Sequence, residues 1–136
     1  MDPATLVGNI LGVAKALLEL AGRLTAAGQN RKEKTATLFE NISGCLAEVS
    51  SEIRRGDVPY GRCHELMTYA QELPDLIRAE VGDEKADELG RTLYSAHDVE
   101  AVAMGLIGVQ NKEPCLSVIE EASGKFRAIA NMVRAR

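Results

Sequence analysis

The sequence predicts an all-α protein, an antiparallel four-helix bundle with an additional C-terminal helix packed on it. Apolar residues recur at helical spacing in five stretches, whereas no stretch shows the alternating polarity of a half-buried strand above background. Only 4% of the residues are aromatic, so the apolar residues are mainly Leu, Ala, Val and Ile, which suit close-packed helices. A chain of 136 residues is long enough for one domain with one hydrophobic core, and we expect a single domain over residues 1–136.

The first two expected helices cover residues 3–27 and 31–55. Asp2 can cap the first helix and Pro3 suits its first turn, while Gly28 favours its end. The second helix carries apolar residues along one side and ends at the glycine that follows it.

The third expected helix covers residues 59–81 and starts at Pro59. Pro74 falls inside its apolar pattern, which predicts a kink or a break near Glu72 and Leu73. The fourth helix is expected over residues 83–106, after the stop and cap signals at positions 82 and 83, and the fifth over residues 114–135, opened by a proline.

The first helix is unusual because residues 3–14 contain no charged side chain. A helix of 25 residues would be about 37 Å long, enough to cross a bilayer core, but Lys15 and Glu19 near its middle make it a poor permanent span. No aromatic residue precedes Phe39, so the segment also lacks the usual interfacial anchors of a resident membrane helix.

Small residues recur at spacing four along this helix, as a strip formed by Ala4, Gly8, Gly12 and Ala16. In lipid such a strip lets helices approach closely and associate, while in a water-soluble bundle it seats a tightly packed central helix. Taken alone, the strip favours the packing interpretation over oligomerisation.

Two charged clusters have simple structural interpretations beside functional ones. A solvated helix start explains the basic cluster of Arg31, Lys32 and Lys34. The alternative is that these three cations contact lipid headgroups. The acidic cluster formed by Asp83, Glu84, Asp87 and Glu88 lies in the first turns of the fourth expected helix, where the helix dipole favours carboxylates over a cation site.

The sequence offers no catalytic, cofactor-binding or metal-binding constellation, and we expect the protein not to be an enzyme. The two histidines, His64 and His97, lack a neighbouring base or ligand at useful spacing, and the cysteines at 45, 63 and 115 show no Cys-x-x-Cys pattern. Three widely spaced cysteines without a signal peptide favour a reduced, cytoplasmic protein. A net charge of −4 argues against nucleic acid as a partner.

Three segments resemble a known family. Met1-Asp2-Pro3, Thr5, Gly8, Ile10 and Gly12-Val13-Ala14 look like the start of the fungal HeLo and HeLo-like cell-death domains. The segments RRGDVPYGRC at 54–63 and YAQELP at 69–74 resemble the bacterial Bell domains, proposed prokaryotic relatives of the fungal domains. The resemblance covers residues 3–105.

The resemblance implies a membrane-permeabilising, pore-forming domain of bacterial programmed cell death, innate immunity or antiphage defence. In that family the bundle holds an apolar N-terminal helix until an upstream sensor, such as a nucleotide-binding oligomerising receptor, triggers self-association. The protein would then move from the cytoplasm to the inner face of the cell membrane and act on anionic lipid. Carried over to this sequence, the membrane-active residues are Leu6, Val7, Ile10, Leu11, Val13, Leu17 and Leu18.

One feature departs from the family. Bell proteins commonly carry a C-terminal amyloid-signalling motif, and no Asn/Gln- and aromatic-rich segment occurs in this sequence, which indicates a trimmed chain or a different trigger. A second hypothesis is a soluble death-fold-like adaptor that binds a basic partner through its acidic cluster.

Overall fold

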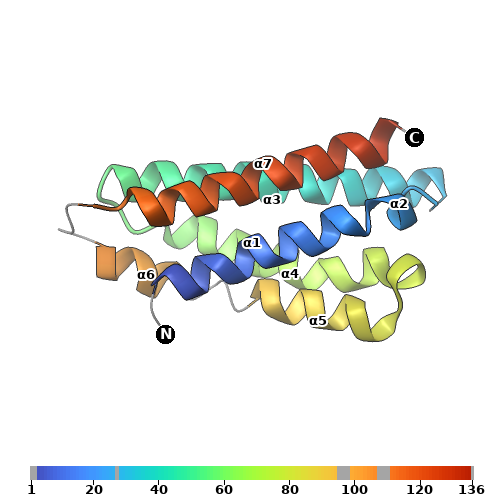
Figure 1. The fold of residues 1–136 in the computed structure, drawn as a ribbon, viewed down its shortest axis with the longest axis horizontal. Helices are drawn as coiled ribbons and strands as arrows, with labels where there is room; N and C mark the ends of the chain where they lie inside the picture. Colours follow the sequence, from blue (N-terminus) through green and yellow to red (C-terminus); the bar gives the residue numbers. More distant parts are fainter. Residues whose placement is uncertain (1–2, 27, 95–98, 107–110, 136) are drawn as a thin grey trace.

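The computed structural model describes residues 3–26, 28–94, 99–106 and 111–135 of the chain (Figure 1). The described residues form seven helices and no strand, so the all-α prediction is confirmed. The helices are α1 (Pro3–Glu19), α2 (Ala21–Leu24), α3 (Gln29–Arg54), α4 (Tyr60–Val81), α5 (Asp83–Tyr94), α6 (Val99–Leu106) and α7 (Glu113–Ala135).

The expected single helix over 3–27 is wrong, because the chain breaks at Leu20 into α1 and α2. Leu20 has φ −90° and ψ 0°. Its amide donates to the carbonyl oxygens of both Ala16 and Leu17, at 3.1 Å each, so the last turn of α1 tightens. The short helix α2 then keeps Ala21 and Leu24 buried at 1% and 2% exposure. Leu17, Ala21 and Leu24 keep helical spacing across the break, so the apolar pattern of the sequence does not mark it.

The helix α4 runs without interruption through Pro74, so of the two predicted alternatives the break near Glu72 and Leu73 does not occur, and the kink stays a prediction. Proline has no amide hydrogen to donate to the carbonyl oxygen of Ala70, four residues earlier. Gly90 of α5 lies against this position, because a Cβ atom added to Gly90 would be 2.5 Å from Pro74 Cγ and 3.4 Å from the Ala70 carbonyl oxygen. The proline therefore marks a close helix crossing instead of a helix end.

The expected helix over 83–106 is described as two helices, α5 and α6, and residues 95–98 between them lie outside the described part of the chain. The expected helices over 31–55, 59–81 and 114–135 agree with α3, α4 and α7 to within two residues at each end. Glycines end α3 and α4 in the left-handed region: Gly56 has φ +88° and Gly82 has φ +92°.

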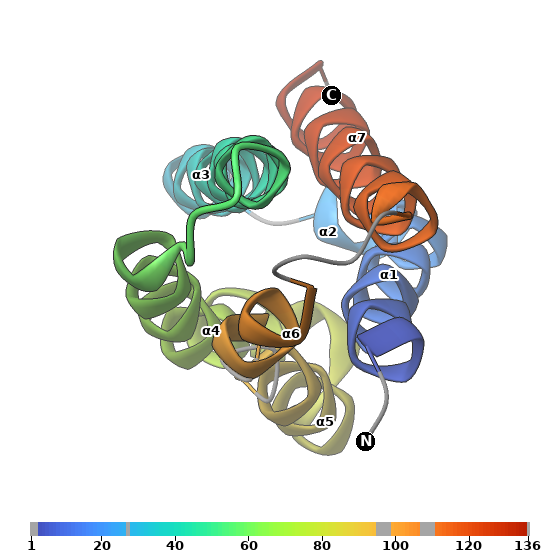
Figure 2. The same cartoon turned by 90° about the vertical axis from the view of Figure 1, so that its left-hand side faces the viewer.

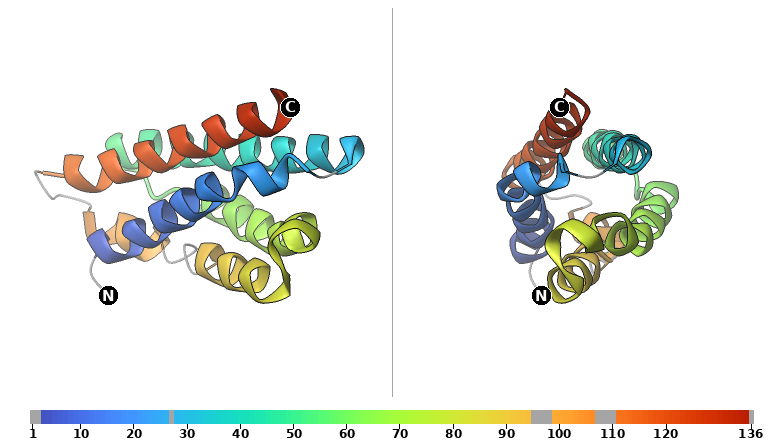
Figure 3. Two further views of the ribbon diagram at one scale, coloured as in Figure 1. Left: turned by 45° about the vertical axis from the view of Figure 1, so that its right-hand side comes forward. Right: turned by 90° about the vertical axis from the view of Figure 1, so that its right-hand side faces the viewer.

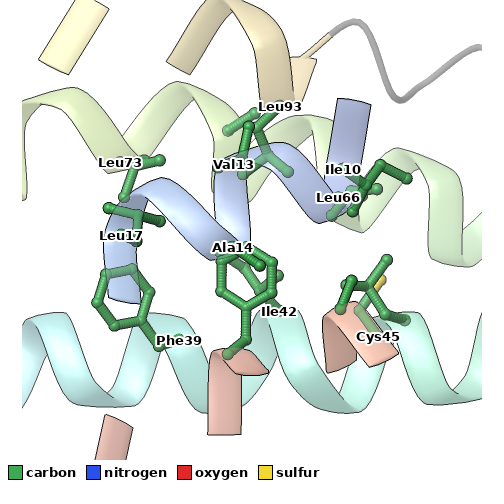
Figure 4. Packing of buried hydrophobic residues seen from close by; sticks show 14 of the residues in the cluster. Ile10, Val13, Ala14, Leu17, Phe39, Ile42, Cys45, Leu66, Leu73 and Leu93 are labelled. Atoms are coloured by element: carbon green, nitrogen blue, oxygen red, sulfur yellow. The ribbon is translucent and has the colours of Figure 1, made fainter. Parts of the chain in front are cut away.

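Viewed along its length, the molecule is a ring of helices in the order α3, α7, α1, α5 and α4, with α6 at one end (Figure 2; Figure 3). The helix α7 lies between α3 and α1, with its most extensive contact along α3. Side chains from all these helices form one buried cluster (Figure 4). The C-terminal helix is thus part of the core.

Candidate functional site

The N-terminal helix α1 places most of its predicted membrane-active residues in the core. Val7, Ile10 and Leu17 have no exposed surface, and Val13 is 1% exposed. Leu11 and Leu18 are half-buried against the same core, whereas the side chain of Leu6 lies outside the described set. Ala14, which the sequence analysis left out of this set, is also fully buried.

The buried side of α1 reaches across the ring. In the view of Figure 4, Leu17 lies between Phe39 of α3 and Leu73 of α4, while Val13 is drawn beside Leu93 of α5 and Ile10 beside Leu66 of α4. Along its length α1 packs mainly on α7, with smaller contacts to α5 and α6. A fully buried Val, Leu or Ile side chain contributes about 1.5–3 kcal/mol relative to an exposed one. The helix α1 can therefore leave this site only where another apolar surface takes the place of the core.

The outer side of α1 carries the small-residue strip. Gly8 and Gly12 are exposed and Ala16 is half-buried, while the side chain of Ala4 lies outside the described set. A Cβ atom added to Gly8 or Gly12 would meet nothing within 4 Å. Close packing inside this fold therefore does not require either glycine, and the packing interpretation of the strip is wrong for these two positions.

A shallow groove separates this strip from α5. Its volume is about 260 Å³, and Lys85, Glu88 and Thr92 line its far side. No charged residue of α1 borders the groove before Lys15, because residues 3–14 are uncharged. The first three turns of α1 thus carry no charged side chain on either side. The buried side is apolar, and the residues of the outer side are small or carry an amide.

The neighbour of α1, α7, is fixed to α3 by a reciprocal pair of hydrogen bonds. The Ser43 hydroxyl donates to the Ser123 carbonyl oxygen and the Ser123 hydroxyl donates to the Ser43 carbonyl oxygen, at 2.8 Å each. Beside them the rings of Phe39 and Phe126 pack with centroids 6.1 Å apart. Sequence reasoning missed the serine pair. Ser-Gly dipeptides occur in the sequence at 43–44 and 123–124, but the sequence did not predict that these two helices are neighbours.

Ion pairs hold the same two helices at both ends. Arg134 of α7 pairs with Glu40 and with Glu33, the latter at 3.3 Å. At the other end Arg54 lies 2.9 Å from Glu120. The pKa of the Glu120 carboxyl is lowered first by a hydrogen bond from the Ser50 hydroxyl and then by Arg54. Hydrogen bonds and ion pairs thus join α7 to α3, and α1 packs mainly on α7.

The three cations predicted as headgroup contacts have different surroundings. Arg31 forms an ion pair with Glu80 of α4. Lys32 is only 6% exposed, so a headgroup contact by this residue would require α3 to change its packing. Lys34 is exposed. The structure therefore does not bring the three side chains together on one free surface.

The acidic cluster at the start of α5 is partly neutralised from within the chain. The Arg78 guanidinium lies 2.8 Å from Asp87 and 3.4 Å from Asp83. Its hydrogen bond lowers the pKa of the Asp87 carboxyl. Glu88 lies 3.9 Å from Lys85, and Glu84 is exposed. Arg78 joins the end of α4 to α5, which fits a structural role for most of the cluster.

Two of the titratable groups considered for catalysis, Cys45 and Cys63, lie near each other in the core. His64 is exposed, and His97 lies outside the described part of the chain. Within the described ranges, no group of three or more His, Cys, Asp or Glu side chains is arranged to hold a metal ion. Cys45 and Cys63 are buried free thiols, and burial raises the pKa of Cys45 to about 12. A thiol with so high a pKa is a poor nucleophile at neutral pH.

In the part of the chain that the structure describes, every helix is too short or too polar to cross a membrane. Comparisons with protein-family models, curated proteins and solved structures find no match to this chain.

Proposed function

We propose that the protein is a membrane-targeting cell-death effector in which α1 is stored in the helical ring and enters lipid when copies assemble. An upstream sensor protein, such as a nucleotide-binding oligomerising receptor, would bring the copies together. The protein would act from the cytoplasm on the anionic inner face of the cell membrane. As part of the proposal, the long helices correspond to the four-helix bundle of the Bell and HeLo-like domains, with α7 as the additional helix.

The observation that carries the proposal is the charge distribution of α1. Its buried side is wholly apolar, and its outer side has no charged residue before Lys15. Moving a charged side chain into hydrocarbon costs several kcal/mol, and the first three turns of α1 would avoid that cost. Because α1 is too short to cross a bilayer alone, the proposal requires several copies to act together in one leaflet or pore wall.

Dye leakage from anionic vesicles tests this function without knowledge of the natural trigger. A C-terminal histidine tag and nickel-chelating lipid would concentrate the protein on the vesicle surface, which replaces the sensor by high effective concentration. The informative variant is Gly12→Glu, since a Cβ atom at this position meets nothing within 4 Å and glutamate favours a helix more than glycine does. It adds a charge to the outer side of α1, and circular dichroism would check that the variant is folded.

The matched control is Gly61→Glu, which makes the same substitution at an exposed, open, helical position of α4. We expect wild type and Gly61→Glu to release dye, and Gly12→Glu to release it at least tenfold more slowly. Equal leakage by Gly12→Glu, or no leakage by wild type at high surface density, contradicts the proposal.

The alternative of a soluble adaptor is less well supported. Its acidic surface would need free carboxylates, but Arg78 already pairs with both Asp83 and Asp87. Binding of a basic protein partner that is abolished by reversing the charge of Glu84 and Glu88, in a chain that ignores vesicles, would favour this alternative.

A further inference from the structure

We propose that a groove between α3 and α4 receives the outer face of α7 from a second copy of the chain, so that copies associate head to tail. The inference rests on the proposed function, because it names the contact through which the effector would assemble. Both surfaces belong to the folded protein, so α1 can stay in place while they meet.

The α3–α4 groove has an apolar floor and acidic rims. Its volume is about 540 Å³, and Leu38 and Leu76 form its floor. Glu33 lies on the α3 rim, while Glu72 and Asp75 lie on the α4 rim. One cation, Lys34, accompanies these three carboxylates. A helix that carries cations on both flanks and small or apolar residues between them would match the groove in shape and in charge.

The outer face of α7 has this composition. Gly124, Ala128 and Asn131 are exposed and recur at three- and four-residue spacing, which gives a low central strip. Lys125 flanks the strip on one side and Arg127 on the other, as their positions about 200° apart on a helix require.

The charges of α7 change along its length. Acidic residues stop at Glu121, and from there to Arg136 all the charged side chains are basic. Met132, next to the strip, is one of the few large apolar side chains that the described chain exposes, at 38%. The Met132 side chain would pack against the apolar floor of the groove.

Two charges on these surfaces have partners within the chain, since Glu33 lies 3.3 Å from Arg134 and Lys125 lies 3.7 Å from Glu121, whereas the other charges are more available. Arg127 and Glu72 form no ion pair with another residue in the described ranges. Asp75 is held only weakly by Arg78, at 3.6 Å, with its side chain 87% exposed. Docking would therefore pair these groups without first breaking a strong contact.

The two surfaces lie on different sides of the ring. In Figure 2 the α3–α4 seam and α7 are separated by α3 itself, and the outer side of α7 faces away from α4. One chain cannot place its α7 in its own groove. The contact is therefore heterologous, and each copy retains a free groove at one side and a free α7 at the other. Such contacts continue into rings or filaments.

The contact would be weak between two free copies. One helix face in one groove is smaller than a stable protein–protein interface, which buries about 800 Å² per partner. It becomes significant when a sensor or a membrane surface raises the effective concentration of the chain. Weak docking thus suits an effector that must remain monomeric until it is gathered.

Sedimentation velocity over a concentration series, in the absence of lipid, tests the inference. The variants reverse the charges on the groove, on α7, or on both surfaces. The groove variant is Glu72→Lys with Asp75→Lys, and the α7 variant is Lys125→Glu with Arg127→Glu. All four residues are at the surface, and circular dichroism would check that each variant is folded. Asp57→Lys with Glu84→Lys is the control, because it makes the same change in net charge at exposed positions outside the groove.

We expect wild type and the control to associate as concentration rises into the high micromolar range. Each exchange variant should have a dissociation constant at least tenfold higher, and the chain that carries all four substitutions should regain association. A wild type that stays monomeric at millimolar concentration overturns the inference, as does a groove variant that associates like wild type or a combined variant that does not recover. Association is measured without vesicles, so its outcome is independent of the dye-leakage assay. A chain that associates but releases no dye would disprove the membrane function and leave the contact between copies standing. A chain that releases dye but does not associate would disprove the contact and leave the membrane function standing.

Discussion

Gly90 of α5 lies directly against the ring of Pro74 of α4, so closely that a Cβ atom on Gly90 would be 2.5 Å from Pro74 Cγ and 3.1 Å from Pro74 Cδ. Real side chains do not approach to the first distance, and a proline ring cannot swing away as a flexible side chain can. The α4–α5 crossing is therefore set by the absence of a side chain at one position and the presence of a ring at the other.

This crossing predicts the effect of Gly90→Ala. Overpacking costs about 1–3 kcal/mol. The higher helix propensity of alanine returns about 1 kcal/mol, so a net loss of up to about 2 kcal/mol is expected in the free energy of unfolding measured with urea. Gly124→Ala, where a Cβ atom meets open space, should instead stabilise the protein by up to about 1 kcal/mol. In a Pro74→Ala background the cost of Gly90→Ala should shrink, and an unchanged cost would show that the ring is not the obstacle.

The reciprocal hydrogen bonds of Ser43 and Ser123 predict a coupled loss of stability. Replacing either serine with alanine removes a buried hydroxyl donor and should lower the free energy of unfolding by about 0.5–1.5 kcal/mol. The two hydroxyl oxygens are also 3.2 Å apart, so the effects should not add. A double-mutant cycle in urea measures the coupling, with the exposed Ser117→Ala as a neutral control. Strictly additive losses would contradict a shared network.

The buried thiol of Cys45 predicts a loss of stability at alkaline pH. Its pKa is raised from 9.0 to about 12, mainly by burial, so the folded protein keeps the thiol protonated where the unfolded chain would ionise it. The resulting stability is fully present below pH 9 and is lost as the pH rises from about 9 to about 12. Between these limits wild type should lose about 1.4 kcal/mol per pH unit more than Cys45→Ala. Equal slopes for the two proteins in urea unfolding at pH 8–10.5 would refute the assignment.

Cysteine accessibility gives a second, kinetic prediction at neutral pH. Cys115 is partly exposed, whereas Cys45 and Cys63 are buried. An alkylating reagent should modify one thiol of the native protein quickly and the other two only on unfolding. Peptide mapping by mass spectrometry identifies the modified residue, and rapid native labelling of Cys63 would mean that the α3–α4 contact opens readily.

The sequence predicted those elements whose ends are marked by local chemistry. Pro59 and Pro114 lie at the starts of α4 and α7, and Gly56 and Gly82 follow α3 and α4 with positive φ. The break at Leu20 has no such marker, because the helical spacing of the apolar residues continues across it from Leu17 to Ala21 and Leu24. Local pattern also shows which side of a helix is apolar but not which helix covers it.

The same limit applies to the candidate site. The burial of Ile10 and Leu17 follows from their spacing, and the uncharged outer side of α1 can be read directly from residues 3–14. The position of α7 between α1 and α3 cannot be read in this way, nor can the ion pairs that occupy Arg31 and Arg78. Side chains distant in sequence decide these contacts.

The central claim is that α1 leaves the ring and enters lipid, and an environment-sensitive fluorophore on α1 tests it most directly. In a Cys115→Ser background, Gly12→Cys would place a nitrobenzoxadiazole label on the outer side of α1, and Gly61→Cys would place the same label on α4 as the control. When the tagged protein is concentrated on anionic vesicles, the label at position 12 should shift to the blue and become protected from an aqueous quencher, while the label at position 61 should remain quenchable. A label at position 12 that stays in water during membrane binding, or during dye leakage, would contradict the account.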